Sequence, residues 1–278
     1  MKVGVLLVAF GAVDLLEQAL RPVTELPIVV VDNSSLAVIR ELCGRHGVPY
    51  VDPGRNLGFA AGVNLGFSEL RRQHGPLDVL VLNPDAVVST GQIERLHQAL
   101  RAVPRRAAVA PALAGPEGPQ RVAWPFPAPA RMWRESLGLL GTSRHDADWL
   151  VGAALLISAE AYQEIGPFDE RFFLYCEETD WQRRAVMQGW SVELVQDVVV
   201  EHVGAGTSSD PAWREALFHA GNETYIRKWF GDRGWASYRL AALAGAAGRS
   251  LLPGARGAAA KMRVRLYLRG PRRAAGLD

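Results

Sequence analysis

The sequence predicts an α/β fold with a mainly parallel sheet flanked by helices, followed by a helical C-terminal extension. Over the first hundred residues, short apolar segments alternate with segments of helical periodicity. The short segments are apolar along their whole length, which is typical of parallel strands covered by helices on both faces. Polar residues follow the strand ends, at Asp32, Arg55-Asn56 and Asp85. Because ligands bind beyond the carboxyl ends of such strands, this edge of the sheet is the expected binding edge.

The individual elements follow from the period of the apolar residues and from the breaks at Gly, Pro and Asn. We expect strands at Val3–Phe10, Pro27–Val31, Val48–Val51, Asp78–Leu82, Ala107–Leu113, Trp149–Ile157 and Val192–Val200. We expect helices at Val13–Leu20, Leu36–His46, Phe59–Arg72, Ala159–Ile165, Glu177–Gln188 and Ala212–Trp229, with Leu240–Leu252 and Lys261–Leu268 as two further helical segments. Gly115–Pro129 is expected to be a surface excursion, and Met132–His145 a mobile loop or a short helix.

The composition is that of an ordinary globular protein, with 49% hydrophobic and 22% charged residues among 278. Cys43 and Cys176 have no metal-binding spacing and do not indicate a disulfide framework, which favours a reducing cytoplasm. The apolar start, Met1–Asp14, is interpreted as a buried strand leading to a helix rather than a signal peptide. No segment offers about 18 uninterrupted apolar residues, so a membrane-spanning helix is not expected.

An acidic cluster stands between aromatic residues in the second half of the chain. Glu177, Glu178 and Asp180 fall within four residues, and Arg183-Arg184 follow one turn later. Such a cluster forms either a solvated helix start or a proton acceptor beside a polar substrate. An ion pair between Asp180 and Arg184 at i,i+4 fits the first alternative.

Three glycines recur at a spacing of four, at Gly58, Gly62 and Gly66, directly after Arg55-Asn56. This spacing puts them on one face of a helix, where they permit close approach of either a ligand or the underlying sheet. Asn56 can cap that helix, whose N-terminal amides favour an anionic group. The segment is neither a Walker loop nor a dinucleotide-binding fingerprint.

Three further polar residues each have a structural and a functional interpretation. Asp32 either caps a helix or accepts hydrogen bonds from a base or ribose. Asp85, in Asn83-Pro84-Asp85, either closes a turn or reaches a divalent cation between two phosphates, since oxygen ligands suit Mg²⁺ or Mn²⁺. His202, which follows the late strand, is either a second metal ligand or a structural histidine.

These motifs occur in an order that resembles inverting family 2 glycosyltransferases, most closely the rhamnosyltransferase-like branch. The resemblance extends from about Val3 to Phe230, and it rests on the joint order of the motifs rather than on any one of them. In chain order they are Val-Asp-Asn-Ser, Asn-Leu-Gly-Phe-Ala-x-Gly-x-Asn-x-Gly, Leu-Asn-Pro-Asp, Trp-Leu-x-Gly-Ala, Gly-x-Phe-Asp-Glu-x-Phe-Phe-x-Tyr-x-Glu-Glu-x-Asp-Trp-x-x-Arg, and His202.

The resemblance implies a GT-A fold in residues 1–230, with a nucleotide-binding half in 1–105, an acceptor half in 106–230, and a helical basic extension in 231–278. It implies a divalent metal, Mg²⁺ or Mn²⁺, held by Asp85 and His202. Asn83 stands where the metal motif of the family begins, which leaves one carboxylate for the metal. The nucleotide-sugar site would include Asp32, Arg55, Asn56, Gly58, Gly62, Asn83, Asp85, Trp149, Gly152 and Asp169.

The resemblance also gives the acidic cluster a role. An inverting transfer needs a base that takes the proton of the acceptor hydroxyl, and a carboxylate within hydrogen-bond reach can do this. Glu178 matches the position of the base, where the family usually has Asp. Glu177 and Asp180 are the rival carboxylates.

We therefore expect an inverting glycosyltransferase of cell-wall or polysaccharide biosynthesis. It would move rhamnose or another hexose from a dTDP- or UDP-sugar to a hydroxyl of a glycan, a lipid-linked glycan or a small molecule. Two alternatives stay open. One is a nucleotidyltransferase, for which the turn at residues 9–12 lacks the expected basic residue. The other is a non-catalytic nucleotide-sugar-binding protein, which would not need Glu178.

Charge is unevenly distributed along the chain. Ala255–Asp278 holds seven bases and one acid, which leaves 24 bases and 28 acids upstream. Leu240–Leu268 combines helical Ala/Leu faces with this excess, which fits a peripheral contact with the inner face of a membrane and equally a helix packed on the catalytic domain. No basic patch interleaved with aromatic residues accompanies the charge, so nucleic acid is not an expected partner.

Overall fold

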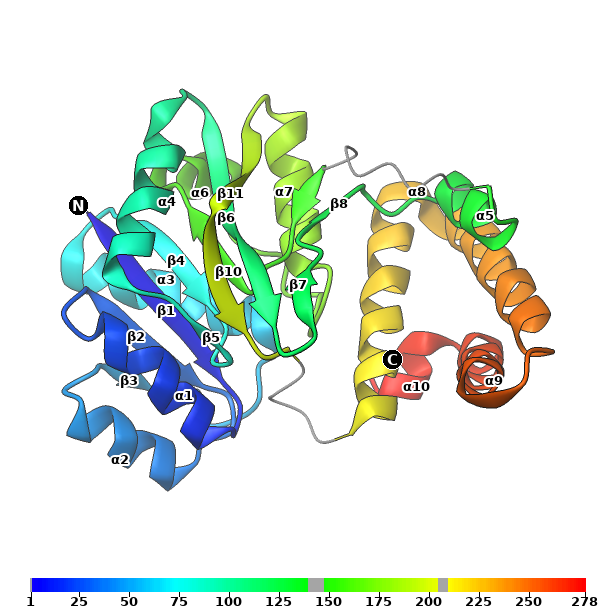
Figure 1. The fold of residues 1–278 in the computed structure, drawn as a ribbon, viewed down its shortest axis with the longest axis horizontal. Coiled ribbons are helices and arrows are strands. Elements are labelled where there is room, and N and C mark those ends of the chain that lie inside the picture. Colours follow the sequence, from blue (N-terminus) through cyan, green and yellow to red (C-terminus); the bar gives the residue numbers. More distant parts are fainter. Residues whose placement is uncertain (1, 140–147, 205–209) are drawn as a thin grey trace. The chain divides into compact units, whose positions relative to one another are not determined.

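The computed structural model describes residues 2–139, 148–204 and 210–278, which form two compact units (Figure 1). The first, called here the α/β unit, comprises Met1–Pro125, Ala147–Phe173 and Glu177–Ser209. The second, called here the helical unit, comprises Phe126–Asp146, Leu174–Cys176 and Asp210–Asp278.

The α/β unit contains a mixed sheet with the strand order β3-β2-β1-β4-β10-β6-β11-β5, and β7 pairs with β6. Strands β3, β2, β1 and β4 run parallel, as do β6 and β11, whereas β10 runs antiparallel to both of its neighbours. A separate two-stranded sheet pairs β8 with β9. The strands are β1 Val3–Ala9, β2 Ile28–Asp32, β3 Tyr50–Val51, β4 Asp78–Leu82, β5 Ala86–Val87, β6 Arg106–Gly115, β7 Gly118–Gln120, β8 Ala123–Trp124, β9 Trp149–Leu150, β10 Ala154–Ile157 and β11 Ser191–His202.

Helices cover the sheet (Figure 1), and they contribute buried apolar residues to the core that they form with it. All residues of β1, β2 and β4 are buried, which agrees with their sequences, apolar apart from Asp32 at the end of β2 and Asp78 at the start of β4. The helices of this unit are α1 Val13–Leu20, the 3₁₀ turn η1 Arg21–Val23, α2 Ala37–Arg45, α3 Phe59–His74, α4 Thr90–Ala102, α6 Ala159–Ile165 and α7 Glu177–Met187.

The helical unit consists of α5 Pro129–Ser136, α8 Pro211–Arg249, α9 Gly254–Arg269 and α10 Pro271–Ala275. It has its own buried residues, among them Tyr225 and Tyr267. The domain boundary predicted at residue 230 lies inside α8, beside Gly231, whose backbone is non-helical with φ 65° and ψ −173°. No helix of the described segments is long and apolar enough to span a bilayer.

Several sequence-based expectations need correction. The strand predicted at Trp149–Ile157 is two strands, because Trp149–Leu150 pairs with β8 and Ala154–Ile157 pairs with β4 and β6. Helix α4 was not predicted. The expected surface excursion after Gly115 contains β7, and the last expected helical segment begins at Gly254 instead of Lys261.

Candidate active site

The carboxyl end of β4 lies beside the start of β10, and this junction brings several predicted site residues together. The Asn83 N–H donates to the carbonyl of Ala153 across 2.8 Å. The preceding residue, Gly152, lies against Glu178, since a Cβ at this glycine would be 3.4 Å from Cγ of Glu178. These contacts link Asn83, at the end of β4, to Glu178 through Gly152 and Ala153.

Glu178 is the second residue of α7, and two residues with a left-handed backbone directly precede this helix. Tyr175 has φ 70° and Cys176 has φ 68°, a conformation that L-residues rarely adopt and that is often found at functional sites. The N–H groups of Gly152, Thr179 and Glu178 itself hydrogen-bond the Glu178 side chain. Fixed N–H groups at a helix start favour a carboxylate at this position.

One carboxyl oxygen of Glu178 is buried. The residue is partly exposed, whereas its Oε2 atom is buried and has no hydrogen-bond partner among the described residues. Burial raises the pKa of Glu178 to about 7, although the three N–H groups act in the opposite direction. A carboxyl group that titrates near neutrality is suited to act as a general base.

Glu177 is more deeply buried, with 4% of its surface exposed. Burial, and next the charge of Glu178, raise the pKa of Glu177 well above its usual range. Its Oε2 atom has no hydrogen-bond partner among the described residues. Of the two adjacent carboxyl groups, Glu177 therefore keeps its proton and Glu178 is the one that ionises.

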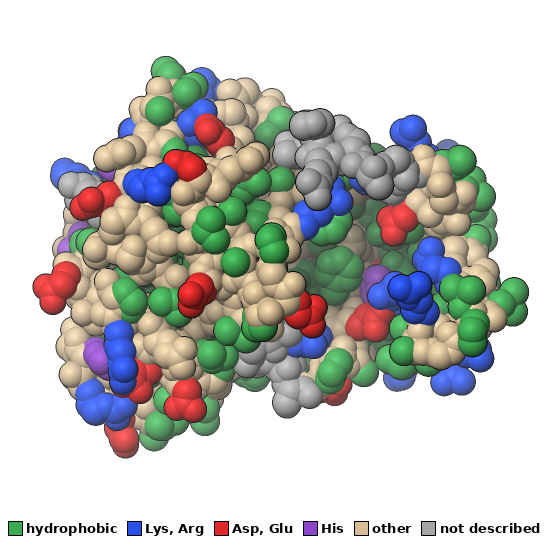
Figure 2. Space-filling view, viewed as in Figure 1, with side chains coloured by type: hydrophobic (Ala, Val, Ile, Leu, Met, Phe, Trp, Pro, Cys, Tyr) green, Lys and Arg blue, Asp and Glu red, His purple; other side chains and the backbone are tan. Residues whose placement is uncertain are grey.

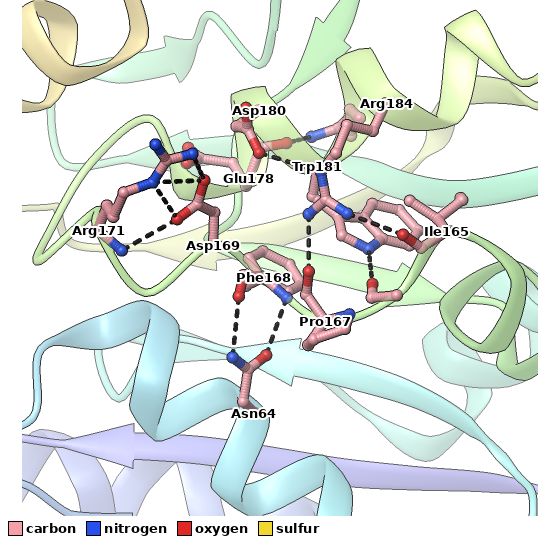
Figure 3. A network of polar contacts seen from close by, with 12 residues as sticks. Asn64, Ile165, Pro167, Phe168, Asp169, Arg171, Glu178, Asp180, Trp181 and Arg184 are labelled. Atoms are coloured by element: carbon pink, nitrogen blue, oxygen red, sulfur yellow. Dashed lines mark hydrogen bonds and ion pairs between the residues drawn. The ribbon is translucent and has the colours of Figure 1, made fainter. Parts of the chain in front are cut away.

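Asp180 is fully buried and forms the predicted ion pair with Arg184, whose Nε lies 3.1 Å from Oδ2 (Figure 3). Arg184 also donates to the carbonyls of Ile165 at 2.9 Å and Pro167 at 2.7 Å. The predicted ion pair is thus confirmed, whereas the solvated helix start expected with it is wrong for Asp180, because this residue is buried. Asp180 orients an arginine that binds the backbone of the loop before α7.

Asn64 of α3 holds the same loop from the opposite side (Figure 3). Its Oδ1 accepts from the N–H of Phe168 at 2.9 Å, and its Nδ2 donates to the carbonyl of Phe168 at 2.9 Å. Trp181 Nε1 donates to the carbonyl of Gly166 at 2.9 Å. This clamping fixes the backbone around Asp169, whose carboxylate is paired with the exposed Arg171 at 2.9 Å.

Gln182 connects α7 to β9 and was not singled out by the sequence. It is fully buried; its Oε1 accepts from the N–H of Leu150 at 2.8 Å, and its Nε2 donates to the Leu150 carbonyl at 2.7 Å. The same Nε2 donates to the carbonyl of Glu178 at 3.1 Å. One amide therefore holds the strand that leads to Gly152 against the helix that carries Glu178.

His202 and Asp85 lie together at the ends of β11 and β4, with His202 Nε2 3.4 Å from Asp85 Oδ1. Gln120 of β7 holds the other ring nitrogen, since its Oε1 lies 2.7 Å from His202 Nδ1 and its Nε2 donates to the His202 carbonyl at 2.8 Å. Because the Gln120 amide is fixed in this way, Nδ1–H is the donor and Nε2 presents a lone pair. Gly115 admits this arrangement, because a Cβ there would overlap Nε2 of Gln120.

Asp85 offers one oxygen atom and His202 one nitrogen atom at this point, and metal binding by this pair stays a prediction. Within residues 2–139, 148–204 and 210–278, no group of three or more His, Cys, Asp or Glu could hold a metal ion. A cation bound by Asp85 and His202 would thus need further ligands from water or from a bound diphosphate.

Asp32 is fully buried, and its carboxylate accepts hydrogen bonds from within the protein. Oδ1 accepts from the N–H of Ser34 at 2.9 Å, while Oδ2 accepts from the N–H of Leu36 at 2.9 Å and from the Tyr50 hydroxyl at 3.0 Å. These contacts hold the turn before α2. Asp32 does not cap this helix as one sequence interpretation expected, because Oδ2 accepts from the N–H of Leu36, the N-cap residue itself. Contact between Asp32 and a nucleotide stays a prediction.

The glycines after Arg55-Asn56 serve close packing. A Cβ at Gly58, whose φ is 83°, would lie 2.5 Å from the carbonyl oxygen of Phe173, and one at Gly62 would lie 2.8 Å from Val8 of β1. Asn56 does not cap α3 as expected, because its Oδ1 accepts from the N–H of Gly58, the N-cap residue itself, at 2.9 Å. Arg55 and Asn56 are both exposed at the start of this helix.

Trp149 begins β9 and is half-buried, with its Nε1 donating to the carbonyl of Pro125 at 3.1 Å. It thus lies on the strand that Gln182 holds. Its role in shaping a sugar site stays a prediction, as do the nucleotide-binding roles of the other residues named from the sequence.

The mixed sheet and the helices that flank it form a GT-A fold, which the solved structures described below share. A family model described as glycosyl transferase family 2 matches residues 5–143, half of the chain. The chain belongs to glycosyltransferase family 2.

Curated relatives agree with this assignment. The chain is 31% identical over 210 residues to the N-acetylglucosaminyl-diphospho-decaprenol L-rhamnosyltransferase of Mycobacterium tuberculosis, a match that covers 66% of this chain and 67% of the relative. It is also 31% identical over 185 residues to a low-salt glycan biosynthesis hexosyltransferase of Haloferax volcanii, covering 63% of this chain and 58% of the relative.

Solved structures show the same fold at lower identity. A mannosyltransferase from Pyrobaculum calidifontis superimposes with a TM-score of 0.56 at 17% identity, covering 99% of this chain and 83% of that chain. The glucosyl-3-phosphoglycerate synthase of Mycobacterium tuberculosis gives a TM-score of 0.58 at 14% identity, covering 82% and 78%.

Proposed function

We propose that this enzyme transfers rhamnose or another hexose, with inversion, from a dTDP- or UDP-sugar to an acceptor hydroxyl in the cytoplasm. Glu178 acts as the general base. The observation that carries this proposal is the position of the Glu178 carboxyl group, which lies against Gly152 one residue from the contact between Ala153 and Asn83. A proton acceptor is thus linked through two residues to Asn83, which belongs to the predicted nucleotide-sugar site.

In the proposed step, the acceptor oxygen forms a bond to the anomeric carbon while the bond from that carbon to the diphosphate oxygen breaks. The diphosphate leaves with the bonding electron pair, and the hydroxyl proton moves to the Glu178 carboxylate. Its pKa of about 7 makes this carboxylate available near neutral pH, while still basic enough to take a proton in the transition state. Glu177 stays neutral beside it and adds no second charge.

The residues at the ends of β4 and β11 fit a divalent cation. Asp85 Oδ1 and His202 Nε2 are 3.4 Å apart, and Gln120 fixes the tautomer that directs the Nε2 lone pair toward the carboxylate. Asp85 and His202 would hold Mg²⁺ or Mn²⁺, with diphosphate oxygens as further ligands. When bound, the metal would stabilise the negative charge that develops on the leaving diphosphate.

One curated relative and two structures of similar fold support the choice of donor and acceptor class. The name of the Mycobacterium tuberculosis relative specifies an L-rhamnosyl group and a diphospho-decaprenol acceptor. The structures of similar fold were solved with GDP-mannose and Mn²⁺ in one case and with UDP and Mn²⁺ in the other. We therefore place lipid-linked glycans first among the acceptors, before soluble glycans and small molecules.

The test of this function is a donor screen that measures release of nucleoside diphosphate, combined with the variant Glu178→Gln. We expect kcat to fall by about 10²- to 10⁴-fold, because the general base is lost, with an unchanged dissociation constant for the nucleotide by calorimetry. Glu94→Gln, an exposed carboxylate on α4, is the matched control and should behave as wild type. Unchanged turnover in Glu178→Gln would exclude Glu178 as the base.

Two further measurements test the stereochemistry and the metal. NMR of the product should show an anomeric configuration opposite to that of the donor, and retention would overturn the proposed single displacement. Mn²⁺ affinity, followed by EPR in the presence of UDP or dTDP, should weaken in His202→Ala and in Asp85→Asn. Equal affinity in wild type and both variants would exclude this pair as the metal ligands.

A further inference from the structure

The corner between α8 and α9 exposes apolar residues in a strongly basic part of the chain. From Arg233 to Leu277 the sequence contains ten Lys and Arg residues and no Asp or Glu. Leu251 and Leu252, which form the corner, are 87% and 48% exposed, and Leu251 is the most exposed large hydrophobic residue of the described chain. Basic and apolar side chains lie next to one another on this unit (Figure 2).

The inner face of α9 packs against α8, so the orientation of its outer face is fixed within the helical unit. Ala260 and Tyr267 are buried, and the Tyr267 hydroxyl lies 3.0 Å from Nδ1 of His219 in α8. Arg263 is paired with Glu215 of α8 at 2.6 Å. A side chain at Gly257 would overlap the carbonyl oxygen of Leu252, so this glycine lets the corner fold tightly onto the start of α9.

The opposite face of α9 combines small or apolar residues with bases. Helical spacing of three and four residues puts Ala255, Ala258, Ala259 and Met262 on one side, all of them exposed. Arg265 and Arg269 continue this side, while Arg256 and Lys261 flank it, and all four bases are exposed. We call this surface, together with the Leu251-Leu252 corner, the corner patch.

We propose that the corner patch binds the surface of an anionic lipid bilayer, with the two leucines entering the interface and the bases contacting lipid headgroups. An apolar tip surrounded by long cationic side chains fits such an interface, because the bases can reach the headgroups while the tip enters the acyl region. The proposal is independent of the sugar transfer, since it concerns binding alone.

Two other occupants fit the corner patch less well. A second copy of this chain would bring two identical basic surfaces together, which like charges oppose. A nucleic acid would be expected to meet aromatic side chains on which its bases stack. The aromatic residues of this segment, Trp235, Tyr238 and Tyr267, are at least 95% buried.

The test is cosedimentation of the full chain with vesicles, without donor or acceptor. We expect binding to vesicles of equal parts phosphatidylcholine and phosphatidylglycerol, no binding to phosphatidylcholine alone, and weaker binding as salt increases. The triple variant Lys261→Ala, Arg265→Ala, Arg269→Ala should reduce the partition coefficient by about fivefold for each base removed. The double variant Leu251→Asn, Leu252→Asn should reduce it by at least about tenfold.

The matched controls lie in the α/β unit, where Met187→Asn removes an exposed hydrophobic residue and Arg45→Ala an exposed base. Both should bind vesicles as wild type does, and circular dichroism should show all variants folded. Equal vesicle binding by wild type and both patch variants would overturn the proposal, as would no binding to anionic vesicles. Sedimentation velocity and an oligonucleotide titration test the two other occupants. If wild type does not bind vesicles, and the patch variants lose a dimer that wild type forms, the surface belongs to a second copy of the chain. If the patch variants instead lose nucleic-acid binding, the surface belongs to a nucleic acid.

Discussion

Two adjacent glutamates at the start of α7 differ in what they can do, although they are the same residue type. Glu177 is 4% exposed, whereas Glu178 is partly exposed and receives N–H groups from Gly152 and Thr179. The hydrogen bonds lower the free energy of ionising Glu178. Burial and the charge of Glu178 raise the free energy of ionising Glu177. Local environment, rather than residue type, separates a base from a neutral partner.

The substitution Glu177→Gln should change how stability depends on pH. The folded-state pKa of Glu177 is raised above its unfolded value, so its contribution to stability is complete below an unfolded pKa of about 4.3 and is lost as pH rises through the folded pKa. Glutamine stays neutral throughout. The Tm of the variant minus that of wild type should therefore become more positive as pH rises above the unfolded pKa of about 4.3, and a difference that is constant with pH would contradict this account.

Residue-level prediction from the sequence succeeded where the partners are close in the chain. The ion pair between Asp180 and Arg184 spans one helical turn, so the sequence alone indicated it. Gln182 and Gln120 were not found, because their partners, Leu150 and His202, are 32 and 82 residues away. A glutamine has no distinctive pattern, and only the fold decides which backbone or ring it meets.

Gln182, which joins β9 to α7, is expected to lower the pKa of Glu178. In wild type, kcat should rise with pH through an apparent pKa of about 7, as Glu178 loses its proton. In Gln182→Met, Leu150 loses its side-chain partner, and the N–H of Gly152 is no longer held at Glu178. Because that N–H favours the ionised form, the pKa of Glu178 should rise.

The acid limb of the kcat profile should therefore move to higher pH in Gln182→Met, with activity recovering on the alkaline side. Gln188→Met, an exposed glutamine directly after α7, is the control. A uniform loss of kcat at every pH would show that Gln182 supports the fold without positioning the base. The variant should also unfold at lower urea concentration, because two buried backbone groups lose their partner at about 1–3 kcal/mol each.

The start of α3 offers a second test at the level of an element. Gly58→Ala should destabilise by more than Gly54→Ala, although both glycines have positive φ, 83° and 73°. Both substitutions introduce backbone strain of about 1–3 kcal/mol. Only at Gly58 would the new Cβ lie 2.5 Å from the carbonyl oxygen of Phe173, whereas at Gly54 nothing lies within 4 Å. Urea midpoints measure the difference, and equal midpoints would show that the contact with Phe173 relaxes at no cost.

Elements were predictable from the sequence where one periodicity continues without interruption. β1, α1, β4 and α6 were found with almost the observed bounds. Helix α4 was missed although its start carries a capping box, in which the N–H of Gln92 donates to Ser89 Oγ and the N–H of Ser89 donates to Gln92 Oε1. The break between β9 and β10 was not legible, because the run from Trp149 to Ile157 is apolar on both sides of Gly152.

The charge of the complete chain is segregated, and its net value of +2 conceals this. The part upstream of Ala255 carries more acids than bases, whereas the segment from Arg233 to Leu277 carries ten bases and no acid. A mildly acidic body has little attraction for an anionic surface, so the basic segment would determine how the chain meets one. The sequence indicated this excess but left its role open, because only the structure shows which bases and leucines are exposed.

If this protein both transfers a sugar and binds the bilayer through the corner patch, salt should change the apparent KM for a lipid-linked acceptor more than the KM for a water-soluble one. With a lipid-linked acceptor in anionic vesicles, raising NaCl from about 50 mM to about 500 mM should increase the apparent KM severalfold, because the Debye length shrinks from above 10 Å to below 5 Å. With a water-soluble acceptor, the same change should leave KM within about twofold. The triple variant Lys261→Ala, Arg265→Ala, Arg269→Ala should already show the high apparent KM on vesicles at low salt and a normal KM on the soluble acceptor. An equal salt effect on both acceptors would place the sensitivity in the binding of donor or acceptor instead of in attachment to the bilayer.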